Sequence, residues 1–237
     1  MLQLKNLTVS VGKKTIIDGF NFTYEKGKIY AVMGPNGSGK STLSLSIMGH
    51  PTYMLKKESR IMKDGKRIDN IDANKRSAAG LFLSFQTPLS LSGITIHQLL
   101  QLALSGKKDP LQIRQETEKY AKELKISDEL LKRSLNDGAS GGEKKKLEVL
   151  QAAVLDKDIL IFDEIDTGVD VDALRTISKF LDKHRKDKTY ILITHYNRIL
   201  HYLKPDKVLV LVNGKLVKVG DHTLAQKIEK EGYAKHT

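Results

Sequence analysis

The stretch GPNGSGKST at residues 34–42 restricts the possible folds of this chain more than any other feature of its sequence. It follows the short apolar run KIYAVM at 28–33 and leads into STLSLSIMGH at 41–50, which has helical character. In a strand, loop and helix of this order, backbone N–H groups and the positive end of the helix dipole both face the loop and attract a phosphate. The sequence therefore predicts a phosphate-binding loop at the edge of a buried sheet.

The loop fits the Walker A pattern, and its parts divide the binding of a nucleotide among them. Lys40 should span the β- and γ-phosphates, and the Ser41 hydroxyl should ligate Mg²⁺. We therefore expect ATP and Mg²⁺ as cofactors, while an ordinary glycine-rich turn is the alternative interpretation. The expected nucleotide contacts are Gly34, Pro35, Asn36, Gly37, Ser38, Gly39, Lys40, Ser41 and Thr42.

Other short apolar runs, bounded by polar residues, are too short for ordinary helices and predict further buried parallel strands. These runs are LFLSF at 81–85, ILIF at 159–162 and YILIT at 190–194. Residues 2–11 and 15–24 partly alternate apolar and polar positions, which predicts an antiparallel pair with Phe20, Phe22 and Tyr24 in the core. Near the end of the chain, the Asn-Gly pair at 213–214 between two apolar runs predicts a hairpin.

A change in composition marks residues 88–137, where HQLLQLAL and IRQETEKYAKELKI repeat apolar residues at spacings of three and four. This pattern predicts a helical subdomain inserted into an α/β core formed by 1–87 and 138–237. The length of 237 residues suits one compact domain, 1–237, that carries such a subdomain.

Polar residues follow the predicted strands. Asp163 and Glu164 come after ILIF, Gln86 after LFLSF, and His195 after YILIT. Because ligands bind at the carboxyl edge of parallel strands, these side chains should lie near Lys40. Asp163 can hold Mg²⁺ through water, Gln86 can contact the metal or the attacking water, Glu164 can direct that water, and His195 can sense the γ-phosphate. Capping of the next element by the two acids is the alternative. The catalytic candidates are Lys40, Gln86, Glu164 and His195, and the metal candidates are Ser41, Gln86 and Asp163.

Six motifs in one order resemble those of the ABC ATPases over nearly the whole chain. They are GPNGSGKST, Gln86 in FLSFQTP, ASGGE at 139–143, ILIFDE at 159–164, TGVD at 167–170 and ITH at 193–195. The resemblance implies an α/β P-loop NTPase of ABC type, with a mainly parallel core sheet, an N-terminal antiparallel β-subdomain and an inserted α-helical subdomain. It also implies hydrolysis of ATP to ADP and phosphate.

The same resemblance implies that two copies of the chain pair head to tail in the ATP-bound state. Ser140, Gly141 and Gly142 would then contact the ATP held by the second subunit, and Asp170 would couple the two sites across the interface. A serine and small residues at a helix start present unobstructed donors to an anion. Ser140 as an ordinary helix N-cap is the alternative, and both interpretations can hold together.

A finer likeness connects the chain with the SufC family, the ATPases of Suf iron–sulfur cluster assembly. It depends on SGGEKK in place of SGGQ, on ITHYNRILHYLKPD at 193–206 and on GDHTLAQKIEKEGY at 220–233. This likeness implies SufB- or SufD-like scaffold partners, with the segment after Gln86 and the helical insert as the partner surface; internal packing of that segment is the alternative. The chain has no cysteine, so the cluster ligands would belong to the partners.

A cytoplasmic location without membrane insertion is expected, since the start MLQLKNLTVSVGKK lacks signal-peptide features and no segment approaches about 20 apolar residues. Two other functions stay open. One is a transporter ATPase with separate membrane subunits. The other is a nucleic-acid-associated ABC ATPase, which the net charge of +12 brings into consideration and the short insert and single phosphate loop oppose.

Three consecutive lysines follow the ASGGE motif. Successive helical residues differ by about 100° in direction, so Lys144, Lys145 and Lys146 cannot form one stripe and at least one should point inward. Solvated lysines are the simpler interpretation; we also consider a pairing of Lys145 with Glu164 that restrains ATPase activity before two copies close. Two positions depart from the family pattern, namely Glu143, where glutamine is common, and Val11, where many members have an aromatic residue.

Overall fold

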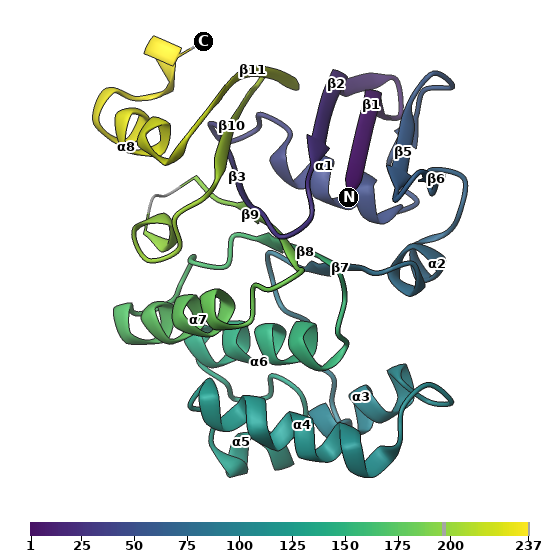
Figure 1. Ribbon diagram of the computed structural model, residues 1–237, viewed down its shortest axis with the longest axis vertical. Helices are drawn as coiled ribbons and strands as arrows, with labels where there is room; N and C mark the ends of the chain where they lie inside the picture. Colours follow the sequence, from purple (N-terminus) through teal and green to yellow (C-terminus); the bar gives the residue numbers. More distant parts are fainter. Residues whose placement is uncertain (196–197, 237) are drawn as a thin grey trace.

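The computed structural model describes residues 1–195 and 198–236; residues 196–197, within the stretch ITHYNRILHYLKPD, and 237 lie outside the described residues. Its sheets and helices are stacked along the long axis of the molecule (Figure 1). One antiparallel sheet consists of β1 (Leu2–Val11), β2 (Lys14–Tyr24), β4 (Met54–Leu55), β5 (Arg60–Lys63) and β6 (Lys66–Arg67). The second sheet has the order β11 (Lys215–Gly220), β10 (Lys207–Val212), β3 (Ile29–Met33), β9 (Thr189–Ile193), β8 (Ile159–Asp163) and β7 (Leu81–Ser84).

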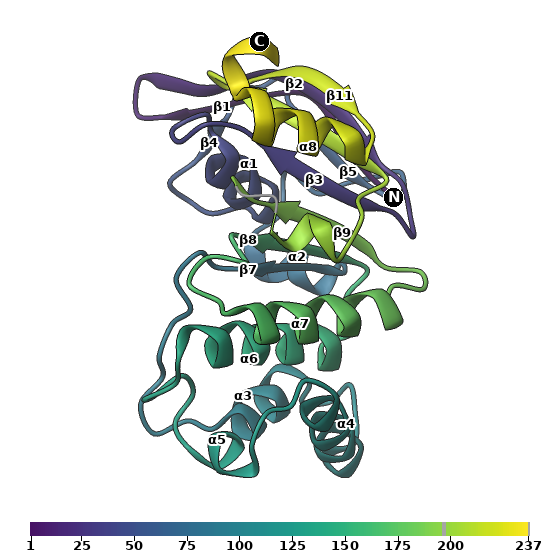
Figure 2. The ribbon, with the colours of Figure 1, turned by 90° about the vertical axis from the view of Figure 1, so that its left-hand side faces the viewer.

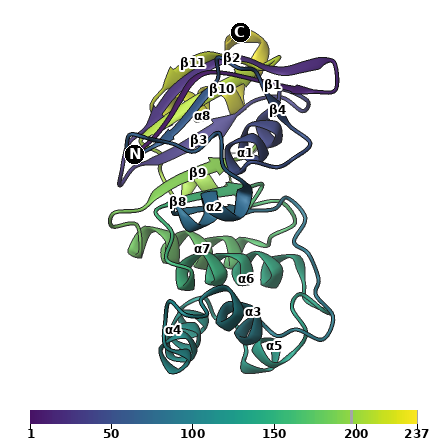
Figure 3. The same ribbon diagram turned by 90° about the vertical axis from the view of Figure 1, so that its right-hand side faces the viewer.

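The second sheet is parallel from β10 to β7, and only its edge pair β10–β11 is antiparallel. The helix α1 (Lys40–Met48) lies on one side of the parallel strands, and α6 (Gly141–Val154) and α7 (Val171–Lys183) lie on the other (Figures 1 and 3). The other helical segments are α2 (Ala73–Ala78), α3 (Ile96–Ala103), α4 (Pro110–Glu123), α5 (Asp128–Lys132), α8 (His222–Glu231) and the 3-10 turns η1 (Ile199–His201) and η2 (Tyr233–His236).

Alternation along β3 explains how one strand serves two cores. Ile29, Ala31 and Met33 belong to the cluster shared with α6 and α7, whereas Tyr30 and Val32 belong to the cluster shared with α1 and the antiparallel sheet. Successive side chains of a strand point to opposite faces, so a strand buried on both faces is apolar throughout. The predicted phosphate-binding segment thus begins from a strand that both cores hold in place.

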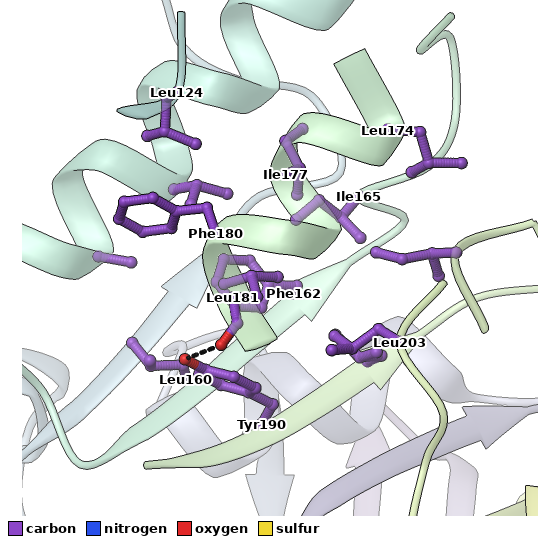
Figure 4. Packing of buried hydrophobic residues seen from close by; sticks show 14 of the residues in the cluster. Leu124, Leu160, Phe162, Ile165, Leu174, Ile177, Phe180, Leu181, Tyr190 and Leu203 are labelled. Carbon is purple, nitrogen blue, oxygen red and sulfur yellow. Dashed lines mark hydrogen bonds between the residues drawn. The ribbon is translucent and has the colours of Figure 1, made fainter. Parts of the chain in front are cut away.

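On the α7 side, aromatic residues fill the space between helix and sheet (Figure 4). Phe162 of β8 packs against Tyr190 of β9, with ring centroids 6.3 Å apart, and Phe180 of α7 lies in the same cluster. The Tyr190 hydroxyl donates a hydrogen bond of 3.1 Å to the Leu181 carbonyl at the end of α7. This bond gives the buried phenol a partner and fixes the end of α7 over the sheet.

The predicted α/β architecture is confirmed, with its mainly parallel core sheet, its antiparallel β-subdomain and its helical insert. The helices α3, α4 and α5 lie within the predicted insert and at the opposite end of the molecule from β1 and β2 (Figure 2). Backbone bonds from Leu91 to Leu135 and from Leu135 to Ile94 join the start and the end of the insert. The predicted hairpin at 213–214 and the burial of Phe20 and Tyr24 are also confirmed.

Several short elements between residues 54 and 78 have no counterpart in the sequence-based prediction. The strands β4 and β6 contain two residues each, which is too short for an alternation of apolar and polar positions to appear. In the described parts of the chain, no helix has the length and apolar character needed to cross a bilayer.

Candidate functional site

The loop between β3 and α1 has the geometry of an anion cradle. Gly37 and Gly39 adopt positive φ angles of 76° and 104°, which favour glycine, and they curl the chain into the start of α1. The Lys40 ammonium donates hydrogen bonds of 2.8 Å to the Gly34 carbonyl and 3.0 Å to the Pro35 carbonyl. Burial lowers the pKa of Lys40, and the nearby acids Glu164 and Asp163 oppose that shift. The ammonium thus lies folded over the loop, where phosphate oxygens would replace carbonyl partners.

The hairpin β10–β11 supports this loop from behind. The Gly214 N–H donates a bond of 2.9 Å to the Ser38 carbonyl, and the Gly214 carbonyl accepts one of 3.0 Å from the Asp18 N–H. A Cβ atom at Gly34 would lie only 2.1 Å from the Leu211 carbonyl oxygen. The loop is therefore held between β2 and the hairpin at van der Waals distance, and the Asn-Gly turn that the sequence predicted forms part of the wall of the site.

Asp163 ends β8 close to the start of α1, and it is 3% exposed. The Ser44 hydroxyl donates a hydrogen bond of 3.2 Å to its Oδ2 atom, whereas Oδ1 is buried without a hydrogen-bond partner among the described residues. Burial raises the pKa of Asp163, and the Ser41 and Ser44 hydroxyls oppose the shift. A buried carboxylate oxygen beside a serine hydroxyl fits Mg²⁺, which prefers oxygen ligands and keeps several waters.

Ser44 is a site residue that the sequence reasoning missed. It lies three positions after Ser41 on α1, so both hydroxyls share one face of the helix, and this spacing was the available signal. Its contact with Asp163 ties the helix that follows the loop to the strand that carries the acids.

Glu164 has a strained backbone, with a φ angle of 52° in the left-handed region. The Gln86 amide donates a hydrogen bond of 2.8 Å to its Oε2 atom, and His195 Nδ1 lies 3.2 Å from Oε1. The Thr167 hydroxyl makes a longer bond of 3.4 Å to Oε2. A non-glycine residue persists in this conformation only when its surroundings determine it, and such residues cluster at functional sites.

The structure thus brings together the polar residues that the sequence placed at the carboxyl edge. Gln86 and His195 each contact Glu164 directly, and Glu164 follows the buried Asp163. The Gln86 side chain is bonded to Glu164 in this structure, and its role at the metal stays a prediction. Their catalytic roles are likewise predictions that the contacts support but do not test.

Ser140 is the N-cap of α6, as one of the two interpretations required. Its hydroxyl and its backbone N–H each donate a bond of 2.8 Å to the Glu143 carboxylate, and its hydroxyl accepts one of 3.3 Å from the Glu143 N–H. This is a capping box, and it gives the departure at Glu143 a structural reason. These Ser140 bonds lower the pKa of Glu143, so the carboxylate is ionised at neutral pH.

The start of α6 packs against the segment TGVD. A Cβ atom at Gly141 would lie 2.4 Å from the Gly168 carbonyl oxygen, and one at Gly142 would lie 3.2 Å from an Asp170 carboxylate oxygen. Asp170 itself is exposed and caps α7 by accepting a bond of 2.8 Å from the Ala173 N–H. The predicted signature residues and the predicted coupling residue therefore lie next to one another within the chain.

Lys145 is the inward-pointing lysine that the helical geometry required, and it is 3% exposed. The considered pairing with Glu164 is wrong for this structure, because the Lys145 ammonium lies 3.1 Å from Glu148 Oε2 and donates to the carbonyls of Phe85 and Gln86. The reason is proximity along the helix: Glu148 is three residues from Lys145, on the same face of α6. Glu164 instead has Gln86 and His195 as partners.

Replacing Lys145 with methionine is expected to lower the free energy of unfolding by about 3 kcal/mol, because it leaves the buried Glu148 without its cation. Burial raises the pKa of Glu148 above its ordinary value of 4.5. The folded state thus favours a protonated Glu148, and the deficit of the variant should shrink as the pH falls through that raised pKa. Urea denaturation at about pH 8 and about pH 5 measures both effects.

Lys144→Met is the matched control, since Lys144 is the adjacent residue of α6 and is only partly buried. A Lys145→Met variant that is no less stable than Lys144→Met at neutral pH would contradict the buried ion pair.

Sequence comparisons place these motifs among known proteins. A family model described as ABC transporter matches residues 17–167. "Probable ATP-dependent transporter ycf16" of Pyropia yezoensis is 43% identical over 242 residues, covering 98% of this chain and 96% of the relative. "Vegetative protein 296" of Bacillus subtilis (strain 168) is 41% identical over 239 residues, covering 98% of this chain and 91% of the relative.

Solved structures show the same fold. A nucleotide-free ATP-binding cassette from an ABC transporter superposes with a TM-score of 0.81 at 24% identity, covering 98% of each chain. The ADP conformation of MJ1267, an ATP-binding cassette of an ABC transporter, has a TM-score of 0.79 at 25% identity, covering 98% of this chain and 95% of that chain. A dimeric bacterial ABC transporter cassette, MJ0796, has a TM-score of 0.81 at 20% identity, covering 94% of this chain and 99% of that chain.

Proposed function

This chain belongs to the ABC transporter family of ATPases, and from that membership we propose that it is the ATP-hydrolysing subunit of a cytosolic Suf-type iron–sulfur cluster assembly complex. The cassette is an ATP-hydrolysing nucleotide-binding domain. One observation carries the assignment of hydrolysis to particular residues. Glu164 directly follows the buried Asp163 and is held in a left-handed conformation between Gln86 and His195.

In the proposed reaction the phosphate loop binds ATP through backbone N–H groups, and the Lys40 ammonium leaves its two carbonyl partners to contact the β- and γ-phosphates. Glu164 accepts a proton from the attacking water, Gln86 orients that water, and His195 contacts the γ-phosphate. Ser41 and Asp163 would hold Mg²⁺, Asp163 through water, with Gln86 as a further ligand. The ion, when bound, neutralises phosphate charge.

A second copy of the chain completes the site in this proposal. The exposed Ser140 caps α6, and the two glycines after it pack closely against Gly168 and Asp170. A helix N-terminus of this kind attracts an anion, so the γ-phosphate held by the opposite subunit fits there. The dimeric MJ0796 cassette, which has the same fold, supports a paired arrangement.

Glu143 should weaken this pairing, because its ionised carboxylate is bonded to the Ser140 hydroxyl that would face the incoming triphosphate. Glu143→Gln keeps an acceptor for the Ser140 N–H and removes the charge. We expect ATP-dependent pairing to tighten by about 3-fold in this variant, given the modest size of solvent-exposed charge interactions. Analytical ultracentrifugation with ATP measures it; unchanged or weaker pairing would show that the charge does not oppose the approach.

The Suf-type assignment is supported by sequence features: SGGEKK, the tail at 220–233 and the absence of cysteine, which leaves cluster chemistry to partner proteins. An apolar groove of about 310 Å³ gives the partners a surface. It includes the exposed Phe85, directly before Gln86, and the exposed Leu89, three residues after it, together with side chains of α3 and the end of the insert. A movement of Gln86 at the site would therefore displace residues that line this groove.

The second candidate is the ATPase subunit of a transporter with separate membrane subunits, which the names of the relatives favour. A nucleic-acid-associated ATPase is favoured only by the charge of +12. Co-expression of the chain with SufB- and SufD-like proteins from the same genome separates the three. We expect a stoichiometric complex whose iron–sulfur cluster content depends on ATP hydrolysis.

Leu89→Asp is the matched variant for the partner surface, since Leu89 is 64% exposed and its replacement should leave the fold intact. It should abolish co-elution with the scaffold proteins while the ATPase site still binds nucleotide. Co-purification with a protein of many membrane-spanning helices, and no complex with the scaffold proteins, would overturn the Suf-type assignment.

A further inference from the structure

Asp166 is a fully buried carboxylate to which neither the ATP chemistry nor the pairing of two copies assigns a role. Its exposed fraction is 0%, and burial raises its pKa. The Thr194 hydroxyl, also fully buried, donates to it and lies 3.0 Å from Oδ1 and 3.1 Å from Oδ2. Backbone N–H groups, including that of Ile199, also contact the carboxylate. A charge-bearing side chain is seldom buried without a requirement for its hydrogen bonds.

The two ends of this contact lie next to two residues of the candidate site. Asp166 follows Glu164 by two residues, and Thr194 directly precedes His195. Two further contacts join the same segments: the Glu164 N–H donates a bond of 2.8 Å to the Ile193 carbonyl, and His195 Nδ1 lies 3.2 Å from Glu164 Oε1. Three contacts therefore connect the segment after β8 with the segment at the end of β9. One is made by the backbone, one by the buried side chains of Asp166 and Thr194, and one by the side chains of Glu164 and His195.

Thr194 is also anchored to the phosphate-binding strand, since its N–H donates a bond of 3.2 Å to the Val32 carbonyl of β3. The Thr194 backbone is fixed by β3 and its hydroxyl is fixed by Asp166. His195, the next residue, therefore has little freedom of position. The left-handed conformation of Glu164 needs the same kind of support, because an unfavourable backbone conformation persists only where several contacts determine it.

We propose that Asp166 is a positioning residue for hydrolysis, which holds the His195 ring against Glu164 through the buried hydroxyl of Thr194. The proposal rests on the proposed role of Glu164. Asp166 touches neither substrate nor metal in it; it acts by fixing Thr194, and removal of the bond would let His195 and Glu164 separate. Small displacements of reacting groups lower rates strongly while leaving the binding of substrate through other contacts unchanged.

Three variants test this. Thr194→Val keeps the shape and removes the hydroxyl, and it should lower kcat for ATP roughly 10-fold with KM unchanged. Thr194→Ser restores a hydroxyl and should recover most of the activity. Ser178→Ala is the control, because the Ser178 hydroxyl is equally buried and bonded to the Leu174 carbonyl of α7, away from the site; it should leave kcat unchanged.

The same substitution in a Glu164→Gln background separates this proposal from the function on which it rests. If the Thr194 hydroxyl acts through Glu164, Thr194→Val should add no further loss to the residual turnover of Glu164→Gln. If Glu164→Gln alone retains wild-type turnover, the proposed function fails. Equal kcat values for Thr194→Val and the wild type, or equal losses for Thr194→Val and Thr194→Ser, would overturn the positioning role. Should Thr194→Val give little folded protein, Asp166→Asn replaces it with the same expected loss in kcat at unchanged KM, and wild-type kcat there would overturn the role too.

Discussion

ATP turnover is expected to fall by roughly 10³-fold when Glu164 is replaced with glutamine, while ATP binding persists. Glutamine has nearly the same shape and can still contact Gln86 and His195, but it cannot accept a proton from the attacking water. The phosphate loop, with Lys40, is unchanged in this variant. Hydrolysis that reopens a pair of subunits would therefore be blocked after ATP has closed it.

Two measurements follow, single-turnover hydrolysis of ATP and the oligomeric state by light scattering with and without ATP. The wild type should hydrolyse its ATP and return to its starting state, whereas Glu164→Gln should remain paired as long as ATP is present. Glu129→Gln is the control, because Glu129 is an exposed acid of α5 in a surface pair with Arg133. Turnover by Glu164→Gln within a few-fold of this control would remove Glu164 from the proposed chemistry.

The sequence predicted the parts of the fold whose residues act locally. The phosphate loop needs glycines at positions with positive φ, the hairpin needs an Asn-Gly turn, and strands buried on both faces need continuous apolar runs. Each of these requirements is met within about ten consecutive residues. The short strands β4 and β5 depend instead on pairing with β1, and β6 on pairing with β5, and two to four residues carry too little pattern to show it.

In the candidate site, sequence order placed Gln86, Asp163, Glu164 and His195 at one edge, because parallel strands share a carboxyl edge. It did not predict the contacts made there. Lys145 was considered as a partner of Glu164, but Glu148, one helical turn away, has that position. The spacing of three residues between Lys145 and Glu148 is a local signal for their pairing, whereas the distance from α6 to β8, which decides whether Glu164 is within reach, depends on the folded chain.

The role of Glu143 shows a related limit. In the sequence Glu143 is a departure from the family pattern, and the structure shows that it forms a capping box with Ser140. The spacing Ser-x-x-Glu at a helix start is itself a local signal for this arrangement, so the structural role was available from the sequence. The effect of Glu143 on the pairing of two copies depends on contacts with the second subunit, which a single chain does not contain.

Gly34→Ala is expected to lower the affinity for ATP by about 100-fold and the free energy of unfolding by about 2 kcal/mol. An added Cβ would lie 2.1 Å from the Leu211 carbonyl oxygen and 2.7 Å from the Ser38 hydroxyl. The carbonyl cannot move away easily, because Leu211 pairs with Leu216 of β11 and directly follows Val210, which pairs with β3. The phosphate loop must shift instead, and the bond from Gly214 to Ser38 that holds it would be lost.

Isothermal titration with ATP and thermal unfolding with and without ATP measure the two effects. Gly37→Ala is the matched control, because it adds the same methyl group to the same loop in open space and introduces only the strain of a positive φ angle of 76°. If the clash with the hairpin decides the outcome, Gly34→Ala should lose far more ATP affinity than Gly37→Ala. Equal losses would mean that backbone conformation alone determines the cradle, and that the close approach of β10 has no part in binding.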